Sequence, residues 1–207
     1  MRIVIFLVLL LSQATAAADT REWFFRVLLD GKEIGSQFFR VWQKDGQTRL
    51  ETEAEMQVKI LFATVYRYRH RNVEAWDGDC LAEIESDTKA NRKEFSVRGE
   101  KKDGFFQVEG SNGAERLPAC VMSFAYWKPD FLQQDYLLNQ QDGKFLDIEV
   151  EGPFAEEIEM GDGTVPALRY HLNADKVDLK LWYTPDDDWL ALESKTERGS
   201  TLRYEPR

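Results

Sequence analysis

Residues 51–56 read ETEAEM and residues 66–71 read YRYRHR. In both stretches charged side chains alternate with apolar, small or aromatic ones, and a period of two residues is that of a β-strand. A reversal of the chain near Leu61 would place Glu55 opposite Arg67, while the apolar and aromatic side chains meet on the other face. The two stretches therefore predict an antiparallel hairpin with a solvated Glu–Arg ladder on one face. Alternatively, Arg67, Arg69 and Arg71 could form a binding site for an anionic head group.

The same alternation extends through most of the chain on either side of this hairpin. The turn sequence Asp30-Gly31-Lys32 joins two strands, and a loop at Gly31-Lys32 would place Leu29 opposite Ile34. Further strands are expected at residues 81–88, 93–101, 105–109, 144–150, 165–172, 177–183, 189–195 and 201–204. Only residues 123–138 lack the alternation, and a short helical segment is expected there, started or interrupted near Pro129.

Consecutive strands joined by short turns indicate a mainly β fold. We expect an antiparallel meander that curls into a barrel or half-barrel, because closure removes exposed sheet edges. A two-sheet sandwich would produce the same alternating pattern and remains an alternative.

The N-terminal residues have the pattern of an export signal. Arg2 precedes an apolar run at residues 3–11, and Ala16-Ala17-Ala18 follows. The run is about nine residues long, whereas a helix that spans a bilayer needs roughly twenty. We therefore expect a cleaved signal peptide at residues 1–18, a single β domain at residues 19–207 with no transmembrane segment, and a periplasmic location.

Charge and cysteine content limit the classes of partner and cofactor. The formal net charge is -10, so nucleic acid is not an expected partner. Cys80 and Cys120 are the two cysteines of the chain, and an oxidising compartment favours a disulfide between them. A metal pair is the weaker alternative because zinc sites need three or four ligands. No metal and no cofactor are expected.

Several motifs resemble those of a known family. They are Asp30-Gly31 with Ile34-Gly35, the run VYRYRHRNVEAWDGDCL at residues 65–81, Ser86-x-Thr88-x-x-Asn91, Tyr126-Trp127, and Leu181-Trp182-Tyr183 followed by Trp189. Together they resemble DUF6134, an uncharacterised family of exported bacterial β proteins, over nearly the whole mature chain. The resemblance implies a Gram-negative exported protein with a mostly antiparallel sheet. It implies no established activity and no catalytic residues.

A search for catalytic chemistry assigns no catalytic residue. The chain contains no Gly-x-Ser-x-Gly elbow, His-Glu-x-x-His motif or phosphate-binding Gly-rich loop. His70 and His171 both fall in expected strands, where a packed or surface role is the simpler interpretation. The enzyme hypothesis therefore rests on dispersed carboxylates or a histidine, and a non-catalytic role is favoured.

The favoured function is an exported carrier whose curled sheet encloses an apolar or lipid-like ligand. Its expected lining residues are Met56, Phe62, Tyr66, Tyr68, Trp76, Trp127 and Trp182. The same aromatic side chains could instead fill a solid core. The alternative function is an envelope structural or assembly protein, because Ile60, Leu61 and Phe62 form an apolar hairpin tip that could contact a partner.

Overall fold

The computed structural model describes residues 20–207, apart from residues 61–62, 162 and 197–198. The predicted signal peptide, residues 1–18, lies outside the described residues. Thirteen strands form one large sheet. Their bounds are β1 Thr20–Leu29, β2 Lys32–Lys44, β3 Gln47–Ile60, β4 Ala63–Asp77, β5 Cys80–Ala90, β6 Lys93–Lys102, β7 Phe105–Gly110, β8 Gly113–Leu117, β12 Glu149–Met160, β13 Gly163–Ala174, β14 Val177–Tyr183, β15 Trp189–Lys195 and β16 Thr201–Pro206.

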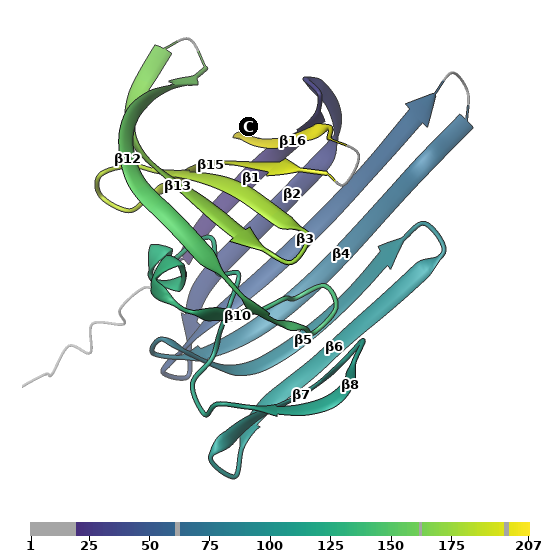
Figure 1. The fold of residues 1–207 in the computed structure, drawn as a ribbon, viewed down its shortest axis with the longest axis vertical. Coiled ribbons are helices and arrows are strands. Elements are labelled where there is room, and N and C mark those ends of the chain that lie inside the picture. The colour runs from purple at the N-terminus through teal and green to yellow at the C-terminus, as the bar shows by residue number, and fades with distance from the viewer. Residues whose placement is uncertain (1–19, 61–62, 162, 197–198) are drawn as a thin grey trace, which may run out of the picture.

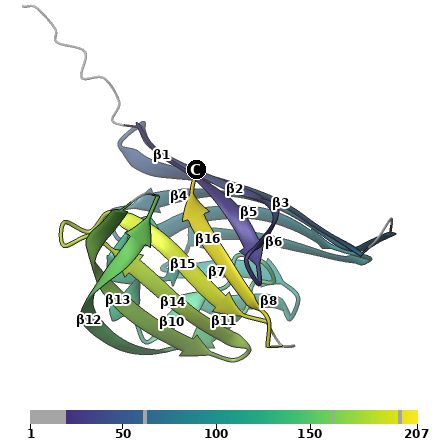
Figure 2. The ribbon, with the colours of Figure 1, turned by 90° about the horizontal axis from the view of Figure 1, so that it is seen from above.

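The sheet curls until its two halves face each other (Figure 1 and Figure 2). The strand order is β12-β13-β14-β15-β16-β1-β2-β3-β4-β5-β6-β7-β8, and every neighbouring pair is antiparallel. Within the described residues the edge strands β12 and β8 do not pair with each other, so the sheet stays open. The mainly β, antiparallel expectation is confirmed, whereas a closed barrel is wrong. The strands also form one continuous sheet instead of the two sheets of a sandwich.

The segment between β8 and β12 lies against the curled sheet. It contains a small sheet of β9 Met122–Ser123, β10 Tyr136–Leu138 and β11 Phe145–Asp147. The helical segment expected near residues 123–138 is limited to a 3₁₀ helix, η1 Pro129–Gln133, and the described residues contain no α-helix. Pro129 suits the first turn of a helix, while the flanking residues pair as strands and limit its length.

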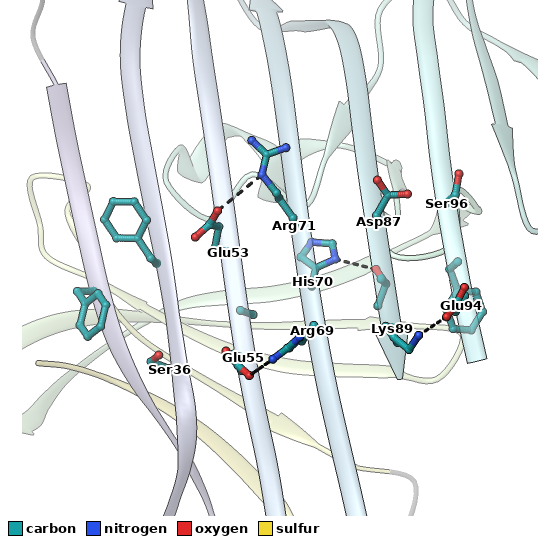
Figure 3. Close-up of a pocket in the computed structure, with 15 residues that line it drawn as sticks. Ser36, Glu53, Glu55, Arg69, His70, Arg71, Asp87, Lys89, Glu94 and Ser96 are labelled. Carbon is teal, nitrogen blue, oxygen red and sulfur yellow. Dashed lines mark hydrogen bonds and ion pairs between the residues drawn. The ribbon is translucent and has the colours of Figure 1, made fainter. Parts of the chain in front are cut away.

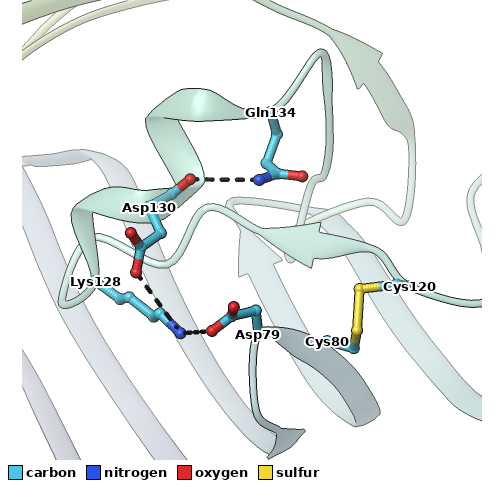
Figure 4. Close-up of a disulfide and its surroundings, with 6 residues drawn as sticks. All are labelled: Asp79, Cys80, Cys120, Lys128, Asp130 and Gln134. Atoms are coloured by element: carbon cyan, nitrogen blue, oxygen red, sulfur yellow. Dashed lines mark hydrogen bonds and ion pairs between the residues drawn. A yellow bond between two sulfur atoms is a disulfide. The ribbon is translucent and has the colours of Figure 1, made fainter.

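A disulfide joins this segment to the end of the large sheet (Figure 4). Cys80, at the start of β5, is bonded to Cys120, as the sequence predicts. The Leu81 N–H donates to the Val121 carbonyl at 2.9 Å, so the backbone continues the attachment beyond the bridge. Lys128 forms ion pairs with Asp79 and with Asp130 at the beginning of η1. These contacts hold the segment over one end of the sheet.

The β3–β4 hairpin has the predicted faces but not the predicted register. Glu55 lies opposite Arg69 instead of Arg67. A β-bulge between Val58 and Lys59 and the position of the reversal shift the pairing by two residues. Because side chains alternate with a period of two, such a shift leaves each side chain on its expected face.

The β1–β2 register is also wrong. Asp30 and Gly31 both have positive φ and form the turn, so Leu29 lies opposite Lys32 instead of Ile34. The pairing of β1 with β2 shifts again between Val27 and Leu28. Two-residue hairpin loops favour Asp-Gly because both central residues need positive φ.

The main core lies between the two halves of the sheet. Among its buried side chains are Phe25, Phe39, Trp76, Tyr183 and Trp189. A smaller cluster on the other face of β12–β15 contains Ile158, Ala167, Trp182 and Ala191. The curled sheet therefore buries side chains on both faces of its C-terminal half.

Candidate functional site

A cavity of about 190 Å³ lies between the inner faces of the two sheet halves. Strands β2 and β4 form one wall, β14, β15 and β16 form the other, and the loop at residues 139–141 closes one side. The lining residues are Gln37, Phe39, Tyr68, His70, Tyr126, Asn139, Gln140, Gln141, Leu179, Trp189, Leu192, Ser194, Leu202 and Tyr204. Residues from seven separate segments therefore converge on one partly enclosed space.

Aromatic rings form one side of this cavity. The Trp189 ring packs edge-on against Phe39, with centroids 4.9 Å apart, and lies 5.3 Å from the Tyr126 ring. Phe25 supports Trp189 from behind at 4.4 Å. Ring pairs at these separations are favourable beyond their buried area, so the wall is held in place by its own packing.

Neutral polar groups form the other side. Tyr68 donates its hydroxyl to Gln141 Oε1 at 3.2 Å, and His70 Nδ1 lies 2.8 Å from Thr88 Oγ1. Burial lowers the pKa of His70 to about 4, and the nearby Asp87 opposes this shift. The imidazole is therefore neutral at neutral pH. No ionised side chain lines the cavity among the described residues.

Beneath the cavity lies a fully buried carboxyl group, Glu74. It accepts hydrogen bonds from Asn72 Nδ2 at 3.0 Å, Trp76 Nε1 at 2.9 Å and Gln140 Nε2 at 3.0 Å. Burial raises the pKa of Glu74, and the hydrogen bonds from its neighbours partly oppose that rise. No ion pair with Glu74 occurs in the described part of the chain. Gln140 therefore connects the cavity lining to a buried acid.

A row of buried polar side chains continues this layer across three strands. Thr52, Asn72 and Ser86 face one another in the register of β3, β4 and β5. Thr52 Oγ1, Asn72 Oδ1 and Ser86 Oγ are buried without a hydrogen-bond partner among the described residues. Buried polar atoms are usually paired, and a hydrocarbon-binding barrel has no need of them. The interior next to the cavity is therefore polar on this side.

The loop that closes the cavity is attached at several points. Besides Glu74, Gln140 Nε2 contacts Ser123 Oγ at 3.2 Å and the Phe124 carbonyl at 3.4 Å. Gly143 has a φ of +77°, and a Cβ added to it would lie 2.9 Å from the Gly110 Cα. The two glycines therefore allow the loop to approach β7 closely. The loop is thus positioned by both the buried acid and the sheet.

The predicted lining residues fall into three groups. Tyr68 lines the cavity, and Met56 packs beside it in a cluster with Val27 and Ala54. Trp76 and Trp127 belong to the filled core, with their rings edge-on at 5.9 Å.

The remaining predicted lining residues lie elsewhere. Tyr66 is exposed on the hairpin. Trp182 is on the opposite sheet face, where its Nε1 donates to Glu156 at 2.6 Å, because Leu181 and Tyr183 take the inward positions of β14. Phe62 and Leu61 lie outside the described residues, as does the side chain of Ile60.

Sequence reasoning missed most of the polar lining. Glu74 shares the alternating face of Tyr68 and His70, and that spacing was the available signal for its burial. Gln140 and Gln141 lie in a loop, where no periodic pattern indicates which way a side chain points.

A second, larger hollow of about 720 Å³ lies on the outer face of β1–β6 (Figure 3). Its charged side chains pair with one another across strands. Arg69 contacts Glu55 at 2.9 Å, and Arg71 contacts Glu53 at 3.6 Å. Exposed pairs of this kind are solvated and mutually neutralised, so we place the candidate site in the interior cavity.

Two further structural findings bear on ligand and membrane chemistry. Among the described residues no three His, Cys, Asp or Glu side chains gather as a metal site would require. In the same part of the chain no helix is both long enough and apolar enough to cross a bilayer.

Comparisons with known proteins agree with this fold. The chain is similar to a solved structure from Brucella abortus, described as a beta-barrel-like protein of domain of unknown function DUF1849, with a TM-score of 0.62 and 9% sequence identity. The match covers 90% of this chain and 94% of that one. At such low identity the similarity shows the fold alone. No curated protein matches the chain.

A family model described as domain of unknown function (DUF6134) matches residues 25–207. The match extends from β1 to the C-terminal residue and so includes every wall of the cavity. It also confirms the resemblance noted in the sequence motifs. The chain therefore belongs to the DUF6134 family.

Proposed function

We propose that this chain is an exported, non-catalytic binding protein whose ligand occupies the interior cavity. The observation that carries the proposal is a partly enclosed space with an aromatic wall on one side and neutral hydrogen-bonding groups on the other. Ligand sites place converging polar groups beside apolar walls, and the polar groups are the more prominent part of this lining. The disulfide Cys80–Cys120 supports an oxidising compartment such as the periplasm.

The size and polarity of the cavity favour a small, uncharged ring compound that carries a hydroxyl or carbonyl group. Sites for drug-sized ligands have volumes of roughly 300–1,000 Å³, and this cavity has about 190 Å³. Tyr68, Gln37 and Gln140 can donate or accept hydrogen bonds, and Trp189 offers a ring face or edge. An ionised ligand would lose its hydration here without a counter-charge. We therefore infer a smaller and more polar ligand than the lipid-like one that the sequence favours.

A binding role fits the lining better than an enzymatic one. His70 contacts the hydroxyl of Thr88, but Thr88 itself does not line the cavity. Glu74 lies below the lining and contacts amide and indole N–H groups. Catalysis requires a base or nucleophile within hydrogen-bond reach of the substrate. Glu74 does not meet that requirement, and His70, which lines the cavity, has its Nδ1 engaged by Thr88.

The test uses a ring alcohol and its charged analogue as probes. Benzyl alcohol is expected to change the Trp fluorescence of the mature protein and to raise its Tm, whereas benzoate should do neither. Ser194→Phe fills the cavity from β15 and should abolish the benzyl alcohol response. Ser36→Phe is the matched control, because Ser36 lies on the outer face opposite Glu55.

Three results would count against the proposal. They are equal responses to benzoate and benzyl alcohol, an undiminished response in a folded Ser194→Phe variant, and no response of the wild-type protein. Native mass spectrometry of protein purified from the periplasm then identifies the natural occupant by its mass.

A further inference from the structure

The β3–β4 hairpin continues beyond the strands on either side of it. On one side the last pair with β2 is Gly35 with Met56, and on the other the last pair with β5 is Tyr68 with Ala90. Residues 57–60 of β3 therefore pair only with residues 63–67 of β4. We call these two segments the arm. Figure 1 and Figure 2 both show it projecting from the body of the sheet.

Apolar side chains are exposed on the arm. Ala63, Thr64, Val65, Tyr66 and Arg67 are consecutive exposed residues, so both faces of the ribbon are uncovered. Val65 is 48% exposed and Tyr66 is 37% exposed. Exposed apolar side chains at the end of a projection indicate a contact with something other than water.

Unpaired positive charges lie at the base of the arm, and one of them, Lys59 opposite Thr64, lies nearer its end. Lys59 and Arg67 lie on the arm, and Arg92 and Lys93 lie at the adjoining β5–β6 turn. That turn is attached to the arm, because the Arg67 N–H donates to Asn91 Oδ1 at 2.8 Å and the Asn91 N–H donates to the Arg67 carbonyl at 2.8 Å. None of these four cations forms an ion pair within the described residues, although the chain as a whole has a net charge of -10.

We propose that the arm binds the surface of an anionic lipid bilayer, with its apolar end in the interfacial region and its cations against the head groups. Arg67 and the attached turn with Arg92 and Lys93 lie behind Val65, and Tyr66 lies between them, which matches the order of chemistry across such an interface. A fluid surface also solvates both exposed faces of the ribbon, whereas a protein groove would cover one. The unpaired edges of the arm limit it to the interface, because backbone N–H and C=O groups need partners in hydrocarbon.

The acidic body does not prevent this contact. At 0.1 M salt, charges more than about 10 Å apart are largely screened. A projecting arm keeps the acidic body away from the surface while its own cations make contact. The arm therefore separates the basic contact surface from the net charge of the chain.

The test measures binding of the full mature chain to vesicles by co-sedimentation. Vesicles of phosphatidylglycerol and phosphatidylcholine are compared with vesicles of phosphatidylcholine alone at 0.1 M salt. We expect the wild-type protein to sediment with the anionic vesicles and to remain in solution with the neutral ones. Arg67→Ser, Arg92→Ser and Lys93→Ser combined should weaken binding about 100-fold, since each basic residue near the surface contributes a roughly constant increment.

A second variant tests the apolar part of the arm, and matched variants control for exposure and charge. Val65→Ser combined with Tyr66→Ser should abolish sedimentation with the anionic vesicles. Phe154→Ser replaces an exposed ring on β12, and Lys101→Ser with Lys102→Ser removes charge at the opposite end of β6. Both controls should bind as the wild type does, and Tm measurements verify that all variants fold.

The proposal is overturned if wild-type protein does not sediment with anionic vesicles, if it binds both vesicle types equally, or if the arm variants bind normally. If the wild-type protein does not sediment with anionic vesicles, a protein partner at the arm becomes the remaining interpretation. The benzyl alcohol response does not depend on vesicles, so failure here leaves the cavity proposal intact.

Discussion

The two faces of β4 carry similar residue types in opposite environments. On the outer face Arg71 forms ion pairs with Glu51 and Glu53 on β3. On the inner face Glu74 has no cation beside it among the described residues and accepts hydrogen bonds from neutral donors such as Trp76 Nε1. The outer carboxyl groups are stabilised by opposite charge in contact with water. The inner one is stabilised by directed hydrogen bonds where water is excluded.

This difference shows that the environment of a charged residue decides how much the residue contributes to the free energy of unfolding. Glu53 is 59% exposed and can lose its partner to solvent at little cost. Glu74 is fully buried, and its removal would leave several N–H donors without acceptors. Substitutions on the two faces of one strand should therefore differ greatly in their effect on stability.

The largest effect is expected for Glu74→Ala. The variant leaves Asn72 Nδ2, Trp76 Nε1 and Gln140 Nε2 unsatisfied and opens a void, so the free energy of unfolding should fall by about 3–5 kcal/mol. Urea unfolding of the protein measures this change. Glu53→Ala is the matched control on the outer face and should cost at most about 1 kcal/mol. Equal losses in the two variants would remove the contrast between the faces.

The second effect concerns pH and His70. Its pKa in the folded protein is about 4, below the usual 6.5, because burial disfavours the charged imidazole. The folded state therefore loses stability as pH falls from 6.5 towards 4, by as much as about 3 kcal/mol. Unfolding measured across this range should show the loss in the wild type and not in His70→Gln. His171→Gln is the control and should retain the loss; an unchanged slope in His70→Gln would contradict the assignment.

A smaller effect with the opposite sign is expected for Glu74→Gln. Burial raises the pKa of Glu74, so the protonated acid favours folding and this contribution is lost as pH rises through the folded pKa. The amide of the variant cannot ionise, and its NH2 group cannot accept the hydrogen bond from Trp76 Nε1. We therefore expect the free energy of unfolding to fall by about 1–2 kcal/mol near pH 4.5. The gap to the wild type should narrow at higher pH. A gap that widens with pH would mean that the carboxylate form is the favoured one.

The smallest effect is expected on the outer ladder. Arg69→Ala removes the ion pair with Glu55. The side chain of Arg69 is 65% exposed and that of Glu55 is 64% exposed. The loss should be below about 1 kcal/mol and should shrink further at high salt. A double-mutant cycle with Glu55→Ala measures the coupling between the two residues. A coupling above 2 kcal/mol that is insensitive to salt would show that this face is not solvated as described.

The alternation predicted which side chains share a face more reliably than which residues are opposite one another. The outer position of Arg69 and the inner position of Tyr68 follow from a period of two, which a two-residue shift does not disturb. The bulge between Val58 and Lys59 lies in an ordinary polar and apolar sequence, and nothing in the pattern marks it.

Two other features of the site depend on tertiary structure. Leu181, Trp182 and Tyr183 are all apolar or aromatic, so alternation cannot identify the inward residues of β14. Gln140 reaches Glu74 across 66 residues of sequence from a loop without periodicity. The cavity lining could therefore be predicted in its strand residues only in part, and in its loop residues not at all.

The pairing of β16 with β1 has a consequence for how the chain folds. Arg26 and Glu205 form a hydrogen-bonded ion pair across 179 residues of sequence, in the middle of the strand order. The β1–β8 meander can form from local hairpins, but its first strand keeps an open edge until β16 pairs with it. Pairings between distant segments form slowly because the loop must close first. Until that pairing forms, the edge of β1 is an aggregation-prone surface, and β16 is the strand that covers it.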